Sequence, residues 1–262
     1  MLFPWFRDRR RKKLLQEPWP AEWLRILKTN VAHYLLLKDE QKKLLLDIAR
    51  IIIEEKFWEG CNGLQITDEI KVTISGQAAL LLLGIEHNYY ERVPTILVYP
   101  TSFRTARPDD NADEAFVPDQ AAMGQAVYRG PVILAWDEVL REGSAPERGH
   151  NVVVHEFAHQ LDFLDDSIDG VPPLANYRDR QRWLQVMNQA LEQHRQMLDR
   201  RSGAFFTAQA AESLTEFFAD ASESYFCQPH DLAAEFPEVY AQLQGYYRID
   251  PRQWFQEKQF GS

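Results

Sequence analysis

Two histidines four residues apart, with a glutamate directly after the first, stand in the stretch His155-Glu156-Phe157-Ala158-His159. In a helix, residues i and i+4 lie on the same face, so His155 and His159 can present both imidazoles to one metal ion. Such an ion lowers the pKa of its water and polarises the scissile carbonyl, while Glu156 takes the proton and later passes it to the leaving amine. The motif therefore predicts a zinc-dependent peptidase.

The residues around this motif predict a helix in the protein interior. Val152–Val154 precede the first histidine and Leu161 follows the second, so the segment is apolar except where the chemistry needs polar groups. Asn151 is a typical cap residue, and we expect a helix from about 152 to 164. Buried polar groups need partners, and a metal ion provides one. The alternative is a pair of core histidines beside a salt-bridging glutamate.

A catalytic zinc site needs a third protein ligand and an open position for water. No histidine follows His159 at the short spacing of the metzincin pattern. A carboxylate from a later helix is the alternative, and a helix expected from near 208 to about 226 carries Glu212, Glu216 and Glu223 on one face. All three are candidates, and for each of them the other interpretation is a solvated helix stripe.

Six stretches in the same order along the chain carry a further pattern: GCNGL at 60–64, ILVYP at 96–100, GPVILAW at 130–136, HEFAHQLD at 155–162, GVPPL at 170–174 and TEFFADASE at 215–223. Together they resemble the Mlc titration factor A family, over about residues 20 to 254. Several separate matches in the right order are far more specific than the short zinc motif.

The resemblance implies an α+β, zincin-like fold, similar to the catalytic domain of anthrax lethal factor. A small mixed sheet would pack against the helix that bears the HExxH motif, with additional helices at both ends. The resemblance also implies one zinc ion per chain, with Glu216 as the third ligand beside His155 and His159.

The functions of the family are implied in the same way. Its members are regarded as cytoplasmic zinc peptidases with aminopeptidase-like activity on small substrates, and they also bind a transcriptional repressor of sugar-uptake genes. We therefore expect a peptide substrate. The alternative function is a regulatory protein that sequesters such a repressor and has weak or no peptidase activity.

One position departs from the family pattern. A tyrosine seven residues before the ligand glutamate is thought to stabilise the oxyanion, and that position is Gln209 here. Gln209 could donate an amide hydrogen bond instead, or Tyr177 or Tyr225 could approach from elsewhere, since charge that develops in the reaction needs a donor.

Two further acids have two interpretations each. Asp162 falls three residues after His159 and seven after His155, so it could orient a ligand imidazole by hydrogen bonding. It could equally be a helix-terminal acid that is exposed to water. Glu223 has the same two interpretations.

The rest of the chain supplies the elements that must position these residues. Apolar residues at helical spacing over 21–58 predict two or three amphipathic helices. We expect strands at 71–75, 95–99 and 132–136, a helix over 77–83, a long polar helix over 178–200, and an exposed loop over 104–120. This organisation indicates a single catalytic domain over 21–262 with an N-terminal helical portion.

Residues 1–20 form a basic and aromatic N-terminal arm ahead of that domain. Two interpretations are open for this arm, a solvated tail or a surface that touches an anionic membrane or partner.

The loop over 104–120 is a candidate for substrate binding. An aminopeptidase needs an acidic residue that anchors the free amine of its substrate, and this loop contains several acids. Nothing in the sequence chooses among the loose carboxylates there, such as Asp109, Asp110, Asp113 and Glu114.

Composition excludes several classes of function. The net charge of −10 argues against direct nucleic-acid binding, because a phosphate backbone attracts a basic surface. Cys61 and Cys227 are far apart, so we expect neither a disulfide framework nor a cysteine zinc site, and a reducing cytoplasm fits best. The longest apolar run, Ala78–Leu83, is too short to span a membrane. Oligomeric state and cleavage specificity are not fixed by the sequence.

Overall fold

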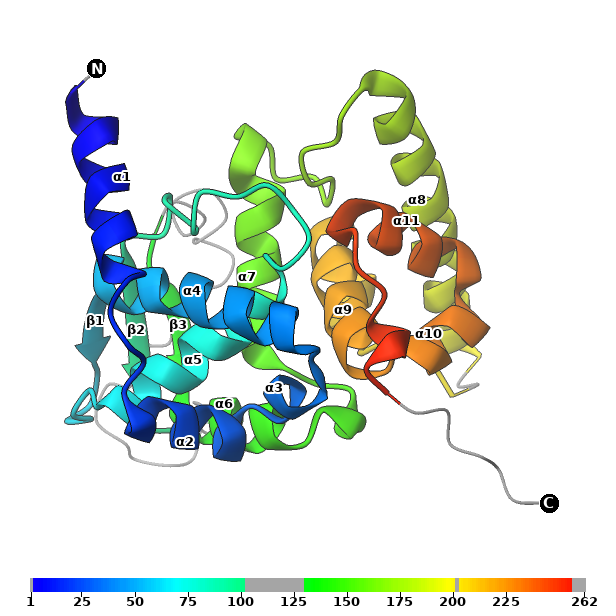
Figure 1. Ribbon diagram of the computed structural model, residues 1–262. Coiled ribbons are helices and arrows are strands. Elements are labelled where there is room, and N and C mark those ends of the chain that lie inside the picture. The colour runs from blue at the N-terminus through cyan, green and yellow to red at the C-terminus, as the bar shows by residue number, and fades with distance from the viewer. Residues whose placement is uncertain (1, 102–129, 201–202, 256–262) are drawn as a thin grey trace.

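The protein is mainly helical with one small sheet, as described for residues 2–101, 130–200 and 203–255 of a computed structural model (Figure 1). The architecture agrees with the expected α+β class. The strands are β1 (Phe57–Gly60), β2 (Thr95–Tyr99) and β3 (Val132–Ala135). The helices are α1 (Leu2–Leu14), α2 (Ala21–Asn30), α3 (Ala32–Leu36), α4 (Asp39–Glu55), α5 (Asp68–Leu80), α6 (Trp136–Ser144), α7 (Val152–Asp162), α8 (Tyr177–Asp199), α9 (Leu214–Cys227), α10 (Pro229–Glu235) and α11 (Pro237–Tyr247).

The sheet has the order β1-β2-β3, and both pairings are parallel, with Phe57 opposite Thr95 and Ile96 opposite Val132. The three described strands thus differ from the mixed sheet that we expected. Parallel neighbours need a crossover connection, and α5 provides it between β1 and β2. Strand β3 contacts α7, so the sheet does pack against the helix that carries the two histidines.

Two of the three expected strands are confirmed, and the third is wrong. Residues 71–75 lie inside α5 and form no strand. Their alternation of polar and apolar residues misleads because α5 is buried around nearly its whole circumference, so neither face needs to be polar. The start of α5 carries helix signals instead, since the Thr67 hydroxyl accepts a hydrogen bond from the Ile70 N–H at 3.3 Å.

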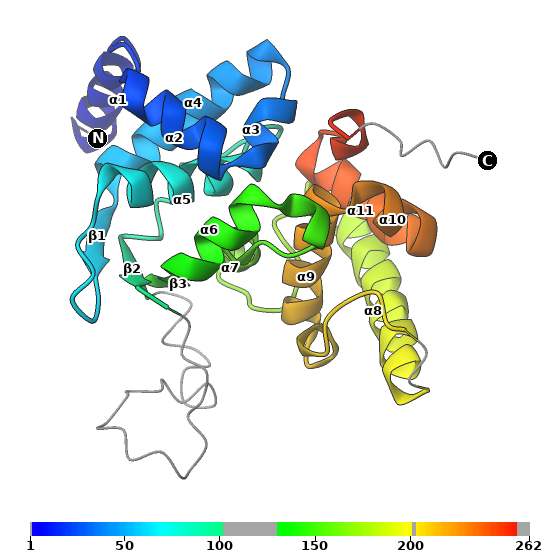
Figure 2. The same cartoon turned by 90° about the horizontal axis from the view of Figure 1, so that it is seen from below.

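Helices α7 and α9 lie side by side at the centre of the molecule (Figures 1 and 2). On one side of this pair are the sheet and the helices α1–α6, and on the other side are α8, α10 and α11. Phe157 in α7 and both Phe217 and Phe218 in α9 are fully buried. Their rings pack against Tyr90, Phe206 and Trp183, respectively, so apolar contacts with the surrounding elements hold each helix and its polar side chains in place.

The ends of α7 and α9 follow from local capping. The Asn151 side chain accepts a hydrogen bond from the Val154 N–H at 2.9 Å, which confirms the predicted start of α7. Helix α9 begins at Leu214 and not near 208, because Ser213 is its cap and accepts from the Glu216 N–H at 3.1 Å. Residues 209–211 form a separate 3-10 turn, and Glu212 lies outside α9.

Three other expectations concern the acidic loop, the cysteines and membrane-spanning segments. The loop over 104–120, with Asp109, Asp110, Asp113 and Glu114, lies outside the described residues. Both Cys61 and Cys227 are free. Among the described helices, none combines the length and the apolar character needed to cross a membrane.

Gly170, in the segment between α7 and α8, lies so close to the start of α9 that it cannot carry a side chain without cost. Its φ is +72°, and an added Cβ would lie 2.4 Å from the Leu214 carbonyl oxygen. We expect Gly170→Ala to lower the free energy of unfolding by about 2–4 kcal/mol, because left-handed strain and the clash act together. Denaturant unfolding measures this loss.

Gly63→Ala is the matched control for this prediction. Gly63 also has a positive φ, +80°, but an added Cβ there meets nothing within 4 Å. Strain alone then applies, and the expected loss is about 1–2 kcal/mol. Equal losses in the two variants would contradict the role that we assign to the close approach of Gly170 and Leu214.

Candidate metal centre

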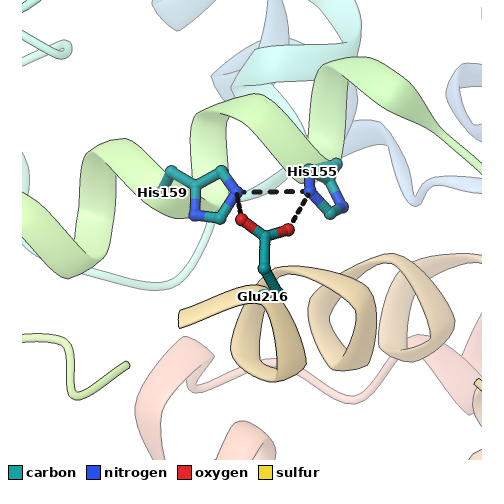
Figure 3. Close-up of side chains that lie close together, drawn as sticks. All are labelled: His155, His159 and Glu216. Atoms are coloured by element: carbon teal, nitrogen blue, oxygen red, sulfur yellow. Dashed lines mark hydrogen bonds and ion pairs between the residues drawn. The ribbon is translucent and has the colours of Figure 1, made fainter. Parts of the chain in front are cut away.

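His155 and His159 in α7 and Glu216 in α9 turn their side chains toward one point between the two helices (Figure 3). The two imidazole Nε2 atoms are 3.2 Å apart. Glu216 Oε2 lies 3.3 Å from Nε2 of His155, and Glu216 Oε1 lies 3.5 Å from Nε2 of His159. The exposed fractions of these side chains are 12%, 8% and 17%, so the point between them is not sealed from solvent.

These separations fit one small divalent ion. Two ligand atoms that are each about 2.0–2.1 Å from a tetrahedral zinc ion lie roughly 3.3–3.4 Å apart. The three observed separations of 3.2, 3.3 and 3.5 Å match that value. Two imidazoles and one carboxylate are also a ligand set that zinc commonly takes, with the fourth position left for water or substrate.

Glu223 of α9 contacts the His155 imidazole at Nδ1, the ring nitrogen that does not face the centre. Glu223 Oε1 lies 2.6 Å from His155 Nδ1, a separation that requires one proton between the two atoms. With that proton on Nδ1, Nε2 keeps its lone pair for a metal ion. The other oxygen of Glu223 accepts the Asn151 N–H at 2.7 Å, which fixes the carboxyl group against the first turn of α7.

The charges around this point favour a cation. Burial lowers the pKa of His159 to about 4, so at neutral pH this imidazole is uncharged and offers a lone pair. Burial raises the pKa of Glu216, but hydrogen bonds and charge interactions with the histidines outweigh it and hold the pKa below its usual value. Burial likewise lowers the pKa of His155, but its bonds to Glu216 and Glu223 raise it well above 6.5. A metal ion would supply the positive charge that these carboxylates attract.

Glu156 follows His155 in α7 and is partly buried. Burial raises the pKa of its carboxyl group to about 7, and the charges of His155, Glu216 and Glu223 also act on it. A carboxyl group with a pKa near neutrality beside a metal centre can both accept and return a proton.

Gln209 lies beside the centre, and the two tyrosines considered with it lie elsewhere. Its amide Nε2 donates to Glu216 Oε2 at 2.9 Å from the 3-10 turn that precedes α9. Tyr177 is 76% exposed at the start of α8. Tyr225 is buried, and its hydroxyl donates to the Ile249 carbonyl. Of these three side chains, Gln209 is the one with a hydrogen bond to the centre in the described part of the chain.

The structure also shows where the remaining acidic candidates, Asp162 and Glu212, lie. Asp162 is 1% exposed, so its interpretation as a helix-terminal acid in water is wrong. It accepts the Gly170 N–H at 3.0 Å, and burial raises its pKa to about 6. Glu212 is exposed ahead of α9 and does not share a helix face with Glu216. Packing therefore brings Glu216 and Glu223 to His155 and leaves Glu212 outside.

One residue that supports the centre was missed by sequence reasoning. Glu142, at the end of α6, accepts the Val152 N–H at 2.7 Å, so two carboxylates, Glu142 and Glu223, hold the start of α7. Negative charge at a helix start is stabilising. No spacing or motif connects Glu142 to the histidines, because the contact depends on how α6 packs against α7.

Glu223 and Glu142 provide a matched test of the support behind His155. We expect Glu223→Gln to weaken zinc affinity by about 10–100-fold, because the carboxylate that orients His155 is lost. Glu142→Gln removes the same charge from the same helix start without touching a histidine, and should leave zinc affinity within about threefold. Competition with a chromogenic chelator measures both constants, and similar losses in the two variants would contradict the prediction.

Comparison with known proteins agrees with this chemistry. The model of the family described as glucose-regulated metallo-peptidase M90 matches residues 5–248. An uncharacterized protein of Synechocystis sp. is 33% identical over 95% of this chain and 91% of its own. Proteins named Mlc titration factor A are similar too: that of Edwardsiella ictaluri is 31% identical over 83% of this chain and 84% of its own. That of Yersinia pestis is 28% identical over 88% and 85%.

Proposed function

Because the chain belongs to the glucose-regulated metallopeptidase family M90, we propose that it is a zinc peptidase with one ion per chain, held by His155, His159 and Glu216. The observation that carries the proposal is the convergence of two imidazole nitrogens and one carboxylate at separations of 3.2 to 3.5 Å. Structural zinc sites normally have four protein ligands, so a set of three suits a catalytic ion.

The protein's own groups have distinct roles in this proposal. A bound zinc ion supplies Lewis acidity for a water molecule and for the scissile carbonyl. Glu156 accepts the proton of the attacking water and returns it to the leaving amine. Glu223 keeps the His155 ring in position. The amide of Gln209, which donates to Glu216, is a donor near the place where charge develops on the substrate.

The proposal also covers the class of substrate and the cellular compartment. We propose aminopeptidase-like action on small peptides in the cytoplasm. The resemblance to the Mlc titration factor A family supports both points, and the two free cysteines suit a reducing compartment.

Elemental analysis together with hydrolysis assays tests the proposal. Purified protein should contain about one zinc ion per chain and should hydrolyse amino-acid anilides or short peptides. Substrates with blocked amino termini should be poor if the action is aminopeptidase-like. Full zinc occupancy without any hydrolysis would overturn the peptidase function, and the absence of zinc would overturn the metal site as well.

A second candidate function is capture of a transcriptional repressor of sugar-uptake genes, with weak or no peptidase activity. Two observations favour it, namely the name Mlc titration factor A carried by relatives and Gln209 at the position of the family tyrosine. A pull-down that compares wild type with Glu156→Gln separates the functions. Capture that is unaffected by the substitution would support two independent functions.

A further inference from the structure

Helix α1 has two faces of different character. The partly buried residues are Arg7, Arg11, Leu14 and Leu15, at spacing i, i+4, i+7 and i+8, which is one side of a helix and the turn after it. The exposed side, here called the outer face, carries two aromatic residues, four basic residues and one acid: Trp5, Phe6, Arg9, Arg10, Lys12, Lys13 and Asp8.

The inner side is fixed to the body of the protein by ion pairs. Arg11 binds both carboxylate oxygens of Glu55 at the end of α4, at 2.8 and 2.6 Å, and its guanidinium lies 4.5 Å from the ring centre of Tyr89. Arg7 pairs with Glu91. These contacts set the rotation of α1 about its axis, so the orientation of the outer face is determined by the fold.

The outer face is strongly basic on an acidic protein. Helix α1 holds six of the 29 Lys and Arg residues of the chain but only one of its 39 acidic residues, Asp8. Arg9, Arg10, Lys12 and Lys13 line one surface hollow together with Phe6 and Gln16. The attraction of this face for anions therefore opposes the net charge of the molecule as a whole.

Two large aromatic side chains stand beside these charges. Trp5 is 55% exposed and Phe6 is 59% exposed, and the Arg9 guanidinium lies 5.5 Å from the Trp5 ring centre. Exposed aromatic side chains next to Lys and Arg are typical of helices that lie in a membrane interface, where rings enter the acyl boundary and cations meet phosphates. An acidic protein partner would need the cations but not the exposed rings.

We propose that the outer face of α1 binds the surface of an anionic phospholipid membrane. Helix α1 lies at the opposite end of the molecule from α8, α10 and α11 (Figures 1 and 2), so contact through it leaves those helices turned away from the bilayer. The contact is peripheral and reversible, because two aromatic side chains and four cations are a weak anchor beside a spanning helix.

Vesicle flotation of the full chain tests this proposal. Wild type should float with phosphatidylglycerol-containing vesicles at low salt, and should stay unbound with pure phosphatidylcholine or at high salt. Replacement of Arg9, Arg10, Lys12 and Lys13 by Gln should lower partitioning by about 1,000-fold, because each cation near an anionic surface contributes about 1 kcal/mol. Trp5→Ala with Phe6→Ala should lower it by about tenfold and leave the salt dependence in place.

The matched control replaces four exposed cations elsewhere, with the same change in net charge: Lys28, Lys43, Arg148 and Arg178, each to Gln. This variant should float like wild type, and circular dichroism should show that every variant is folded. Equal losses in the two quadruple variants would overturn the proposal, as would no flotation of wild type. Binding to polyglutamate without binding to vesicles would indicate an acidic protein partner and would overturn it too. None of these readouts depends on peptide hydrolysis.

Discussion

Glu156→Gln is expected to keep about one zinc ion per chain and to lower kcat for peptide hydrolysis by at least about 100-fold, since positioned general acid–base groups contribute roughly 10²–10⁴-fold. The amide has nearly the same shape as the carboxyl group but cannot take the proton of the attacking water. His155, His159 and Glu216 are unchanged in the variant, so the proposed metal ligands stay in place. Elemental analysis and steady-state kinetics on the same preparation measure both quantities.

Glu147→Gln is the control for that experiment. Glu147 is an exposed glutamate in the short turn just before α7, and the substitution removes the same charge. It should leave kcat within about twofold, as expected for a surface change away from the site. Normal turnover in zinc-replete Glu156→Gln would show that another group moves the proton.

Glu216→Ala is expected to lower zinc affinity by more than about 100-fold, because residues that merely orient a metal ligand already contribute about 10–100-fold. Hydrolysis should fall with zinc occupancy and should return in part when zinc is added in excess. The substitution removes one of the three converging groups and also leaves the Gln209 amide without its acceptor. Zinc titration against a competing chelator measures the constant.

Glu212→Ala is the matched control for the loss of Glu216. Glu212 is exposed and lies four residues earlier, ahead of α9. Zinc affinity and hydrolysis should be unchanged in this variant. If Glu216→Ala bound zinc like the wild type, the assignment of the third ligand would be wrong. The Glu156 and Glu216 variants together separate the group that moves a proton from the group that holds the ion.

Sequence alone determined the features that depend on neighbours along the chain. The four-residue spacing of His155 and His159 places both rings on one face of any helix. Asn151 as a cap fixes where that helix begins. The apolar residues around the motif show that the helix is buried. Resemblance to a family, carried by motifs spread over most of the chain, then selected Glu216 among three equivalent glutamates.

Only the tertiary structure decided how groups distant in sequence meet. Glu216 and Glu223 are 61 and 68 residues from His155, and their positions depend on the packing of α9 against α7. The same packing places Glu223 against Nδ1 of His155 and leaves Glu212 in solvent. The packing of α6 against α7 brings Glu142 to the start of α7. The strand prediction for residues 71–75 was wrong for a related reason. These residues lie in a helix that is buried on nearly all sides, so the sequence lacks the contrast between a polar and an apolar face from which a helix is recognised. Local spacing fixes which side chains share a face, but only packing fixes what that face meets.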